Sequence, residues 1–464
     1  MTIEKTSTVY PTNKHNRPQP PTRLALHGFD RQVLPIQIHN NRFFRQPSIP
    51  FTDVVHQLKA SLAEALELYP PVAGSVQYNE RGEAYIALGK EGIVGTPFLV
   101  DLKDTAYTED DKDLSPRLDA ILPPGSSTLA VKVTQFSCGT ICVASSFHHQ
   151  VADLRGFLDF LEIWAQVNRN EPIDFNRIPD DWTRTPGRFF SEFMKELEGQ
   201  PIPVPAPFEL RDPPSLVPAP SLMAPSVVTN WKLSKTSMEQ MKREFSPSPS
   251  ADSTSWISSG DALTALISGA VTRAREGANI ARLEGRSSTE SGVESIVMPA
   301  DGRLRAPKGD MAGGHYLGNF NNLWTLAFPR ADLLTPTPEA AGRIALAIRS
   351  ALNIQLSPES IAKRIAFLED PSRNSHPGQF GWTSDIILTN WCRFDLKGPK
   401  LDFGWDQCPA FAGTPGGLTA FSPACCLIFE DKATREVFVM LTIEHEGKAG
   451  LVSDPLMTKY ATLI

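Results

Sequence analysis

Two neighbouring histidines stand at the end of an apolar stretch, in the sequence Phe147-His-His-Gln-Val-Ala-Asp153. A histidine with its ordinary pKa of about 6.5 can accept a proton from a hydroxyl or an amine at neutral pH, and such general-base catalysis contributes roughly 10²–10⁴ in rate. Asp153 could bond the imidazole or hold the turn that presents it. A histidine at a strand end is more often structural. The pair could also be two metal ligands, but further ligands at suitable spacing are missing, so we expect no metal.

The spacing of apolar residues predicts the strands and the helix that flank this motif. Residues 129–134 and 141–147 alternate between apolar and polar or small side chains on either side of a Cys138-Gly139 turn, which predicts a β-hairpin that ends at the motif. Neighbouring side chains of a strand face opposite sides, so only one of His148 and His149 should do chemistry. Apolar residues at helical spacing then predict an amphipathic helix after Asp153.

Several common catalytic motifs are missing. The sequence has no phosphate-binding Gly-x-x-x-x-Gly-Lys-Ser/Thr loop and no Gly-x-Gly-x-x-Gly after a predicted strand. Gly-x-Ser-x-Gly is also missing, so there is no nucleophile elbow. A base without a protein nucleophile suggests direct transfer between two bound substrates.

Composition narrows the class of protein. A chain of 464 residues exceeds the roughly 250–300 residues of a single core, which predicts two domains. The net charge of -7 counts against nucleic acid as a partner. Six cysteines without disulfide-like or metal-like spacing favour a reducing compartment. Because we recognise neither a signal core nor an apolar stretch of about 20 residues, we expect a cytoplasmic protein that does not span a membrane.

A proline-rich segment divides the chain. Nine prolines lie between residues 201 and 225, a density that excludes a helix and a central strand. We therefore predict an N-terminal α/β domain at 1–200, an extended crossover at 201–225 and a C-terminal α/β domain at 226–464.

A second motif, Asp402-Phe-Gly-Trp405, follows the first after about 250 residues. Together the two motifs resemble the paired signature of the BAHD acyltransferases, the HXXXD-type acyl-CoA-dependent transferases. Asp301-Gly-Arg303 and the segments 316–319 and 389–391 are weaker matches. The resemblance implies two similar mixed-sheet α/β domains of the chloramphenicol acetyltransferase type, with a channel between them. Acyl-CoA would enter from one side and the acceptor from the other.

The resemblance also implies roles for individual residues. His149 would be the general base that deprotonates the acceptor, and Asp153 would point away from the channel and pair with an arginine, for which Arg303 is the candidate. Trp391 would donate its indole N–H to the developing oxyanion, with Thr389 nearby, and such donors can be worth about 10²–10³ in rate. A core tryptophan and a strand threonine are the alternatives.

Other residues would act as support or bind the co-substrate. Asp402, Gly404 and Trp405 would be structural and would shape the C-terminal domain beside the CoA channel. Ser258 and Ser259, at a predicted helix start, could bind a CoA phosphate through the N-terminal amides, or they could simply cap the helix.

Two positions depart from the family pattern. The glycine after the motif aspartate is replaced by Leu154, and the glycine after Trp405 is replaced by Asp406. Both glycines are expected to ease tight backbone turns.

These observations predict an acyltransferase that moves an acyl group, acetyl by default, from acyl-CoA to a hydroxyl of a specialised metabolite. The protein would be a monomer without a tightly bound cofactor, and its partners would be acyl-CoA and a small alcohol or amine. The alternatives are a carrier-protein-dependent condensation-type transferase, a donor-independent cyclase or lyase in the same channel, and a noncatalytic binding protein.

Overall fold

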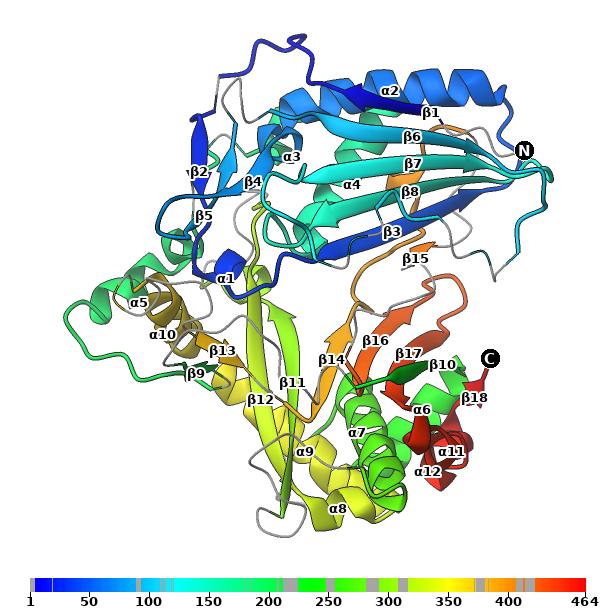
Figure 1. Cartoon of the computed structure of the whole chain (residues 1–464). Coiled ribbons are helices and arrows are strands. Elements are labelled where there is room, and N and C mark those ends of the chain that lie inside the picture. Colours follow the sequence, from blue (N-terminus) through cyan, green and yellow to red (C-terminus); the bar gives the residue numbers. More distant parts are fainter. Residues whose placement is uncertain are drawn as a thin grey trace.

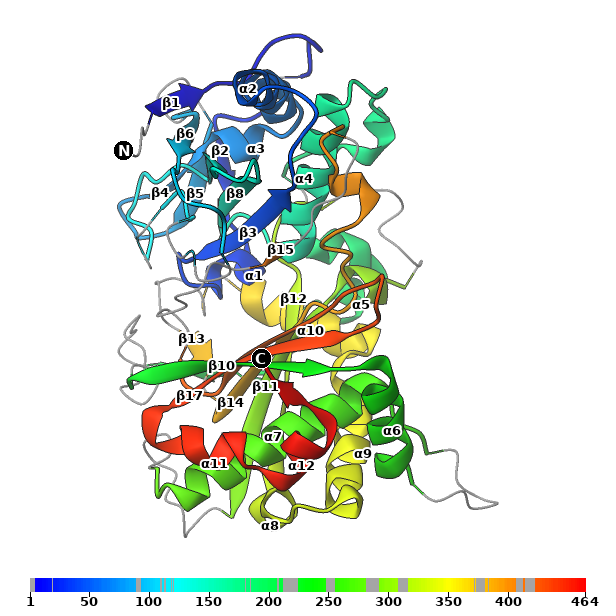
Figure 2. The ribbon, with the colours of Figure 1, turned by 90° about the vertical axis from the view of Figure 1, so that its right-hand side faces the viewer.

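Two β-sheets organise the computed structural model of the chain. Figure 1 shows them one above the other with helices packed on them, and Figure 2 shows the same arrangement after a quarter turn. This confirms the predicted mixed α/β fold with two sheet-containing parts. The structure describes residues 5–18, 20–88, 93–108, 111, 114–117, 119, 121–179, 181–183, 185–206, 208–211, 224–247, 255–280, 292–307, 316–370, 372, 380–382, 384–405, 412–413 and 422–464.

The first sheet is six-stranded and mixed. In spatial order its strands are β1 (Lys5–Val9), β6 (Thr96–Leu102), β7 (Leu129–Gln135), β8 (Ile141–His148), β3 (Gln37–Phe44) and β15 (Ala412–Gly413). β6 and β7 are parallel, and the other neighbours are antiparallel. β7 and β8 form the predicted hairpin. β15 comes from late in the chain, so the C-terminal half supplies an edge strand of this sheet.

Two long helices, α2 (Phe51–Leu68) and α4 (Leu154–Asn168), cover one face of the first sheet (Figure 1). Their apolar faces and the sheet share one core, in which Phe147, Phe157 and Trp164 are fully buried. α4 is the predicted amphipathic helix. Because α4 starts directly after the motif, this core fixes the motif from both sides.

The second sheet is seven-stranded. In spatial order its strands are β12 (Asn321–Pro329), β11 (Val293–Asp301), β14 (Ile386–Asn390), β16 (Cys425–Glu430), β17 (Val437–Glu444), β10 (Ser226–Leu233) and β18 (Thr462–Leu463). β14 is parallel to β11 and β16, and the other pairs are antiparallel. The helices that accompany it are α6 (Lys235–Phe245), α7 (Ser259–Gly277), α8 (Arg330–Leu334), α9 (Pro338–Gln355), α11 (Lys448–Val452) and α12 (Pro455–Tyr460).

Shorter elements complete the described fold. They are α1 (Gly28–Arg31), α3 (Pro70–Ala73), α5 (Ser191–Glu196), α10 (Pro358–Glu369), a three-stranded sheet of β2 (Arg23–Ala25), β5 (Ala84–Ala87) and β4 (Ser75–Tyr78), and a ribbon of β9 (Phe208–Leu210) with β13 (Phe380–Trp382). β9 lies in the proline-rich segment, where a two-stranded ribbon is compatible with the exclusion of a central strand.

The predicted division at 1–200, 201–225 and 226–464 stays a prediction, and residues 207 and 212–223 of the crossover lie outside the described residues. The channel between the two parts also stays a prediction. Across the described residues, every helix is too short or too polar to cross a membrane.

Candidate active site

The histidine motif occupies the turn between β8 and α4. The backbone N–H of His148 donates to Thr128 O at 2.8 Å, and that of His149 donates to Ile36 O at 2.9 Å. Asp153 is the N-cap of α4, because its Oδ1 accepts from Gly156 N at 3.0 Å. A strand end, a tight turn and a capped helix therefore hold the motif in one conformation.

The imidazole of His149 has one nitrogen engaged by its own turn. Nδ1 lies 3.2 Å from Ala152 O, and because a carbonyl only accepts, Nδ1 carries the proton and Nε2 is left as the basic nitrogen. Burial lowers the pKa of His149, while the Asp153 charge and contacts with Ala152 and the Asn319 side chain oppose this effect. The ring is therefore neutral at pH 7, as a general base must be.

His148 has a different environment. Its side chain is buried and its Nδ1 accepts from Gln150 N at 3.3 Å. Burial, followed by the Arg117 charge, lowers the pKa of His148 to about 3. Its ring contacts the backbone of its own turn, and the expectation that only one of the two histidines does chemistry stays a prediction.

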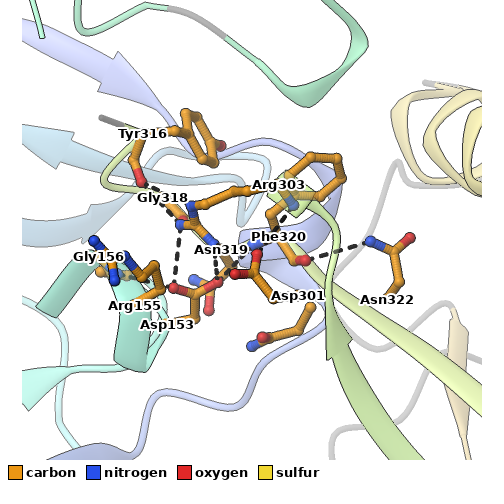
Figure 3. A network of polar contacts seen from close by, with 12 residues as sticks. Asp153, Arg155, Gly156, Asp301, Arg303, Tyr316, Gly318, Asn319, Phe320 and Asn322 are labelled. Carbon is orange, nitrogen blue, oxygen red and sulfur yellow. Dashed lines mark hydrogen bonds and ion pairs between the residues drawn. The ribbon is translucent and has the colours of Figure 1, made fainter. Parts of the chain in front are cut away.

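The Asp153 carboxylate forms a buried ion pair with Arg303, at the start of a short 3₁₀ helix after β11 (Figure 3). Arg303 donates through Nη1 at 2.8 Å and Nη2 at 3.1 Å, which is the bidentate pairing expected for this arginine. Burial disfavours the charged guanidinium, but the Asp153 and Asp301 carboxylates outweigh it and raise the pKa of Arg303. The predicted ion pair is present and joins the two halves of the chain.

The segment 316–320 surrounds this ion pair. Arg303 also donates to Tyr316 O and Gly318 O, each at 2.8 Å, and Phe320 N donates to Asp153 Oδ2 at 2.9 Å. Asn319 reaches further, and its Nδ2 donates to His149 O at 2.8 Å. One segment of the C-terminal half thus contacts both ends of the histidine motif.

Trp391, the predicted oxyanion donor, directly follows β14, and Thr389 lies in the last two residues of that strand. Thr389 pairs with Leu427 of β16, and Trp391 N donates to Ile428 O at 2.7 Å. The Trp391 side chain is half-buried and packs against the core of the first sheet. Within the described structure neither side chain is hydrogen-bonded to His149, so their catalytic role stays a prediction.

The segment from Asp402 to Trp405 packs against a different part of the fold than we expected. Asp402 Oδ1 accepts from Gly404 N at 2.9 Å, and Gly404 has a φ of +89°, which favours glycine. The Trp405 ring lies 4.8 Å from that of Phe44 in β3. The expectation that this motif shapes the C-terminal domain is therefore wrong, because its aromatic residues belong to the core of the first sheet.

Ser258 caps helix α7, the second of the two roles considered for it. Its Oγ accepts from Asp261 N at 3.1 Å, and the Asp261 carboxylate accepts from Ser258 N at 2.7 Å. That carboxylate also pairs with Arg349 at 2.6 Å, so the N-terminus of α7 is already capped by an acidic side chain that has its own cationic partner. Phosphate binding by Ser258 and by Ser259, the first helical residue, therefore stays a prediction.

Residues 1–454 match the family model described as the Transferase family, which comprises the BAHD acyltransferases. The chain belongs to the BAHD acyltransferase family. Acyltransferase uat1 of Mycosarcoma maydis is 26% identical and the match covers 83% of this chain and 80% of that one. The hydroxycinnamoyltransferase of Narcissus pseudonarcissus is also 26% identical, with 96% and 97% covered. The protein is therefore an acyltransferase.

Solved structures share the fold of this BAHD member. The crystal structure of F. graminearum TRI101 with coenzyme A and T-2 mycotoxin has a TM-score of 0.72 at 17% identity and covers 95% of this chain and 99% of its own. Vinorine synthase has a TM-score of 0.66 at 16% identity, with 97% and 96% covered.

The departure from the BAHD pattern at Leu154 has a local explanation. Leu154 is buried as the first residue of α4 and is not among the residues with a positive φ, while the close backbone approach occurs two residues later. A Cβ on Gly156 would lie 1.9 Å from Leu317 O, so this position has room only for glycine. Asp406, the other departure, lies outside the described residues.

Three arginines near the end of β14 were missed. The charges of Arg393 and Arg349 lie close enough to Arg305 to add to the effect of burial and lower its pKa. Arg349 pairs with Asp261 and stacks on Trp256, whose side chain is 57% exposed. In the described chain neither Arg305 nor Arg393 has an ion-pair partner. We call Arg305, Arg349 and Arg393 the arginine patch.

No sequence signal could have revealed the arginine patch, because its members come from three separate segments. The sequence indicated Asn319 only as the last residue of a weak family match.

Among the residues that the structure describes, no group of three or more His, Cys, Asp or Glu side chains is arranged to hold a metal ion.

Proposed function

We propose that this BAHD acyltransferase moves an acyl group from acyl-CoA to a hydroxyl of a specialised metabolite in one direct step. The observation that carries the proposal is the state of His149, whose Nδ1–H is engaged by Ala152 O while Nε2 remains free to accept a proton. Nothing in this arrangement requires a covalent acyl-enzyme.

The proposed step begins when His149 Nε2 removes the proton of the acceptor hydroxyl. The acceptor oxygen then attacks the thioester carbonyl carbon, and the indole N–H of Trp391, with Thr389 nearby, stabilises the oxyanion that forms. When the intermediate collapses, the C–S bond breaks and CoA leaves as the thiol with the proton from the imidazolium. Base and acid are thus the same side chain, and the protons balance.

The arginine patch supports acyl-CoA as the donor. Arg305 and Arg393 carry positive charges that no acidic side chain of the described chain neutralises, although the protein as a whole has a net charge of -7. Repulsion among neighbouring guanidinium groups is a cost that an anionic ligand would relieve. The exposed ring of Trp256 beside Arg349 offers a surface on which an adenine could stack.

The comparisons support the same class of substrates. TRI101 was crystallised with coenzyme A together with T-2 mycotoxin, so that protein accommodates CoA and a second small molecule. Two relatives from Avena sativa are named as N-hydroxycinnamoyltransferases, so an amine acceptor belongs in the screen. We propose acetyl as the first acyl group to test, and a monomer in the cytoplasm as the working form.

The test combines a donor and acceptor screen with two neighbouring histidine variants. The purified protein is incubated with acetyl-CoA or hydroxycinnamoyl-CoA and a panel of alcohols and amines, and products are detected by mass. We expect His149→Ala to lose turnover by about 10²-fold or more while still binding CoA. His148→Ala is the matched control, and it should keep turnover as long as its melting temperature shows a folded protein. Full activity in His149→Ala would overturn the proposed mechanism.

A further inference from the structure

Asn319 has an unusual set of contacts for a residue outside the histidine motif. Its side chain is 0% exposed. Its Nδ2 donates to His149 O at 2.8 Å and to Asp30 Oδ1 at 2.9 Å, and its backbone N–H donates to the same Asp30 oxygen at 2.8 Å. Asn319 therefore connects the backbone of the proposed base to a carboxylate.

Asp30 is itself held in place. It lies in α1 and is 3% exposed, and its Oδ2 accepts from the backbone N–H of His27 at 3.2 Å. The His27 ring nitrogen Nε2 also lies 3.0 Å from this oxygen. Because each oxygen of the carboxylate has partners from a different segment, the carboxylate has one orientation, and this orientation fixes the amide of Asn319.

The histidine motif is thus anchored at two points. Arg303 holds Asp153 at the helix end of the turn, and Asn319 holds His149 at the strand end. Figure 3 shows that Asn319 lies in the same segment as Tyr316, Gly318 and Phe320, beside the ion pair. The Asp153 anchor fixes the helix start, whereas the Asn319 anchor acts on the peptide unit of the proposed base itself.

We propose that Asp30 and Asn319 are positioning residues for catalysis: Asp30 orients the amide of Asn319, and Asn319 fixes the backbone of His149 so that Nε2 faces the acceptor hydroxyl. This inference rests on the proposed function of His149. Neither residue touches the reacting atoms. Misplacement of a catalytic group by about 1 Å can cost roughly 10²-fold in rate, so the loss of this anchor is measurable.

The test compares Asn319→Ala with a matched control in the same segment. Asn322 is equally buried, donates through Nδ2 to Phe320 O at 3.3 Å and accepts from Arg364, but its side chain does not contact the histidine motif. We expect Asn319→Ala to lower kcat by about 10- to 100-fold with KM for both substrates changed less than about threefold. Asn322→Ala should lose stability while keeping kcat close to wild type.

Two further measurements separate positioning from loss of packing. Asp30→Asn should lower kcat, and the double variant with Asn319→Ala should be no slower than the slower single variant, because both changes remove one anchor. The Asn319 side chain raises the pKa of His149, so the acid limb of the Asn319→Ala rate profile should move to lower pH.

Three results would overturn the inference: equal kcat losses in Asn319→Ala and Asn322→Ala, losses of Asp30→Asn and Asn319→Ala that multiply, or a rise in KM without a fall in kcat. Failure of the proposed function looks different, because His149→Ala would then stay active. If His149→Ala is inactive and Asn319→Ala behaves like its control, only the positioning role fails.

Discussion

Replacing Arg303 by methionine tests whether the ion pair with Asp153 holds the two halves of the chain together. The substitution keeps much of the side-chain volume but removes the guanidinium, which makes two hydrogen bonds to Asp153 and others to Tyr316 O, Gly318 O and Asp301. The Asp153 carboxylate would stay buried with only its backbone donors. Removing one partner of a buried pair costs about 3–5 kcal/mol of the free energy of unfolding.

A second variant separates the effect of losing the charge on the free energy of unfolding from the effect of losing the side chain. Asp153→Asn keeps the shape of the side chain but loses the charge, and we expect it to cost about 1.5–3 kcal/mol, the value of hydrogen bonds to a charged group. The double variant removes both charges of the ion pair, so neither of them stays buried without its partner. Its loss should therefore be smaller than the sum of the single losses by about 1–3 kcal/mol.

Urea unfolding, followed by tryptophan fluorescence and far-ultraviolet circular dichroism, measures these losses. Free energies are compared only where the two signals change together, because two sheets could unfold separately. Arg343→Met is the control, since Arg343 pairs with Asp332 on the surface and its loss should leave stability close to wild type. Single losses that add to within about 0.5 kcal/mol in the double variant would refute the reasoning.

Three other predictions concern His149, Gly156 and the arginine patch. The general base must be unprotonated, and burial lowers the pKa of His149. We therefore expect kcat/KM to be constant at neutral pH and to decrease only when the pH falls below about 6.5. A decrease of kcat/KM that begins above neutral pH would contradict the assignment of His149 as the base. Gly156→Ala would place a methyl group 1.9 Å from a backbone carbonyl oxygen and should destabilise the protein by about 1–3 kcal/mol in thermal unfolding. Gly277→Ala is the control, because its Cβ would meet nothing within 4 Å, and it should be neutral or slightly stabilising. The double variant Arg305→Gln/Arg393→Gln should raise KM for acyl-CoA about tenfold or more at low salt in steady-state kinetics. Its kcat and its KM for the acceptor should stay within about twofold of wild type. An unchanged KM for acyl-CoA would show that the arginine patch is not part of the donor site.

Local patterns explain why the surroundings of the histidine motif were predictable. The alternation of residues 129–147 specifies a hairpin, and the spacing of apolar residues after Asp153 specifies a helix, because both depend on neighbours within a few positions. The pairing of Asp153 with Arg303 came from the family resemblance. A buried carboxylate requires a partner, but periodicity alone does not say which arginine supplies it.

Other features depend on contacts that local patterns do not encode. An aspartate is usually exposed to solvent, yet Asp101 is buried in β6 and forms an ion pair of 3.3 Å with Lys132. Arg42 is fully buried in β3 and lies over the Phe403 ring, 4.6 Å from its centroid. An isolated charged residue in a sequence gives no sign that a distant aromatic ring will cover it.

The sequence by itself determined the class of this protein and the secondary structure on either side of its proposed base. The strand, the turn, the capped helix and the paired signature each depend on residues within a short segment of the chain. Only the tertiary structure decided what holds that base in place. The contacts of Asn319 with Asp30 and His149 join residues 289 and 170 positions apart, and those of Trp405 with the first sheet join opposite ends of the chain. Such contacts arise when separate hydrophobic faces pack together, and no spacing within one segment specifies them.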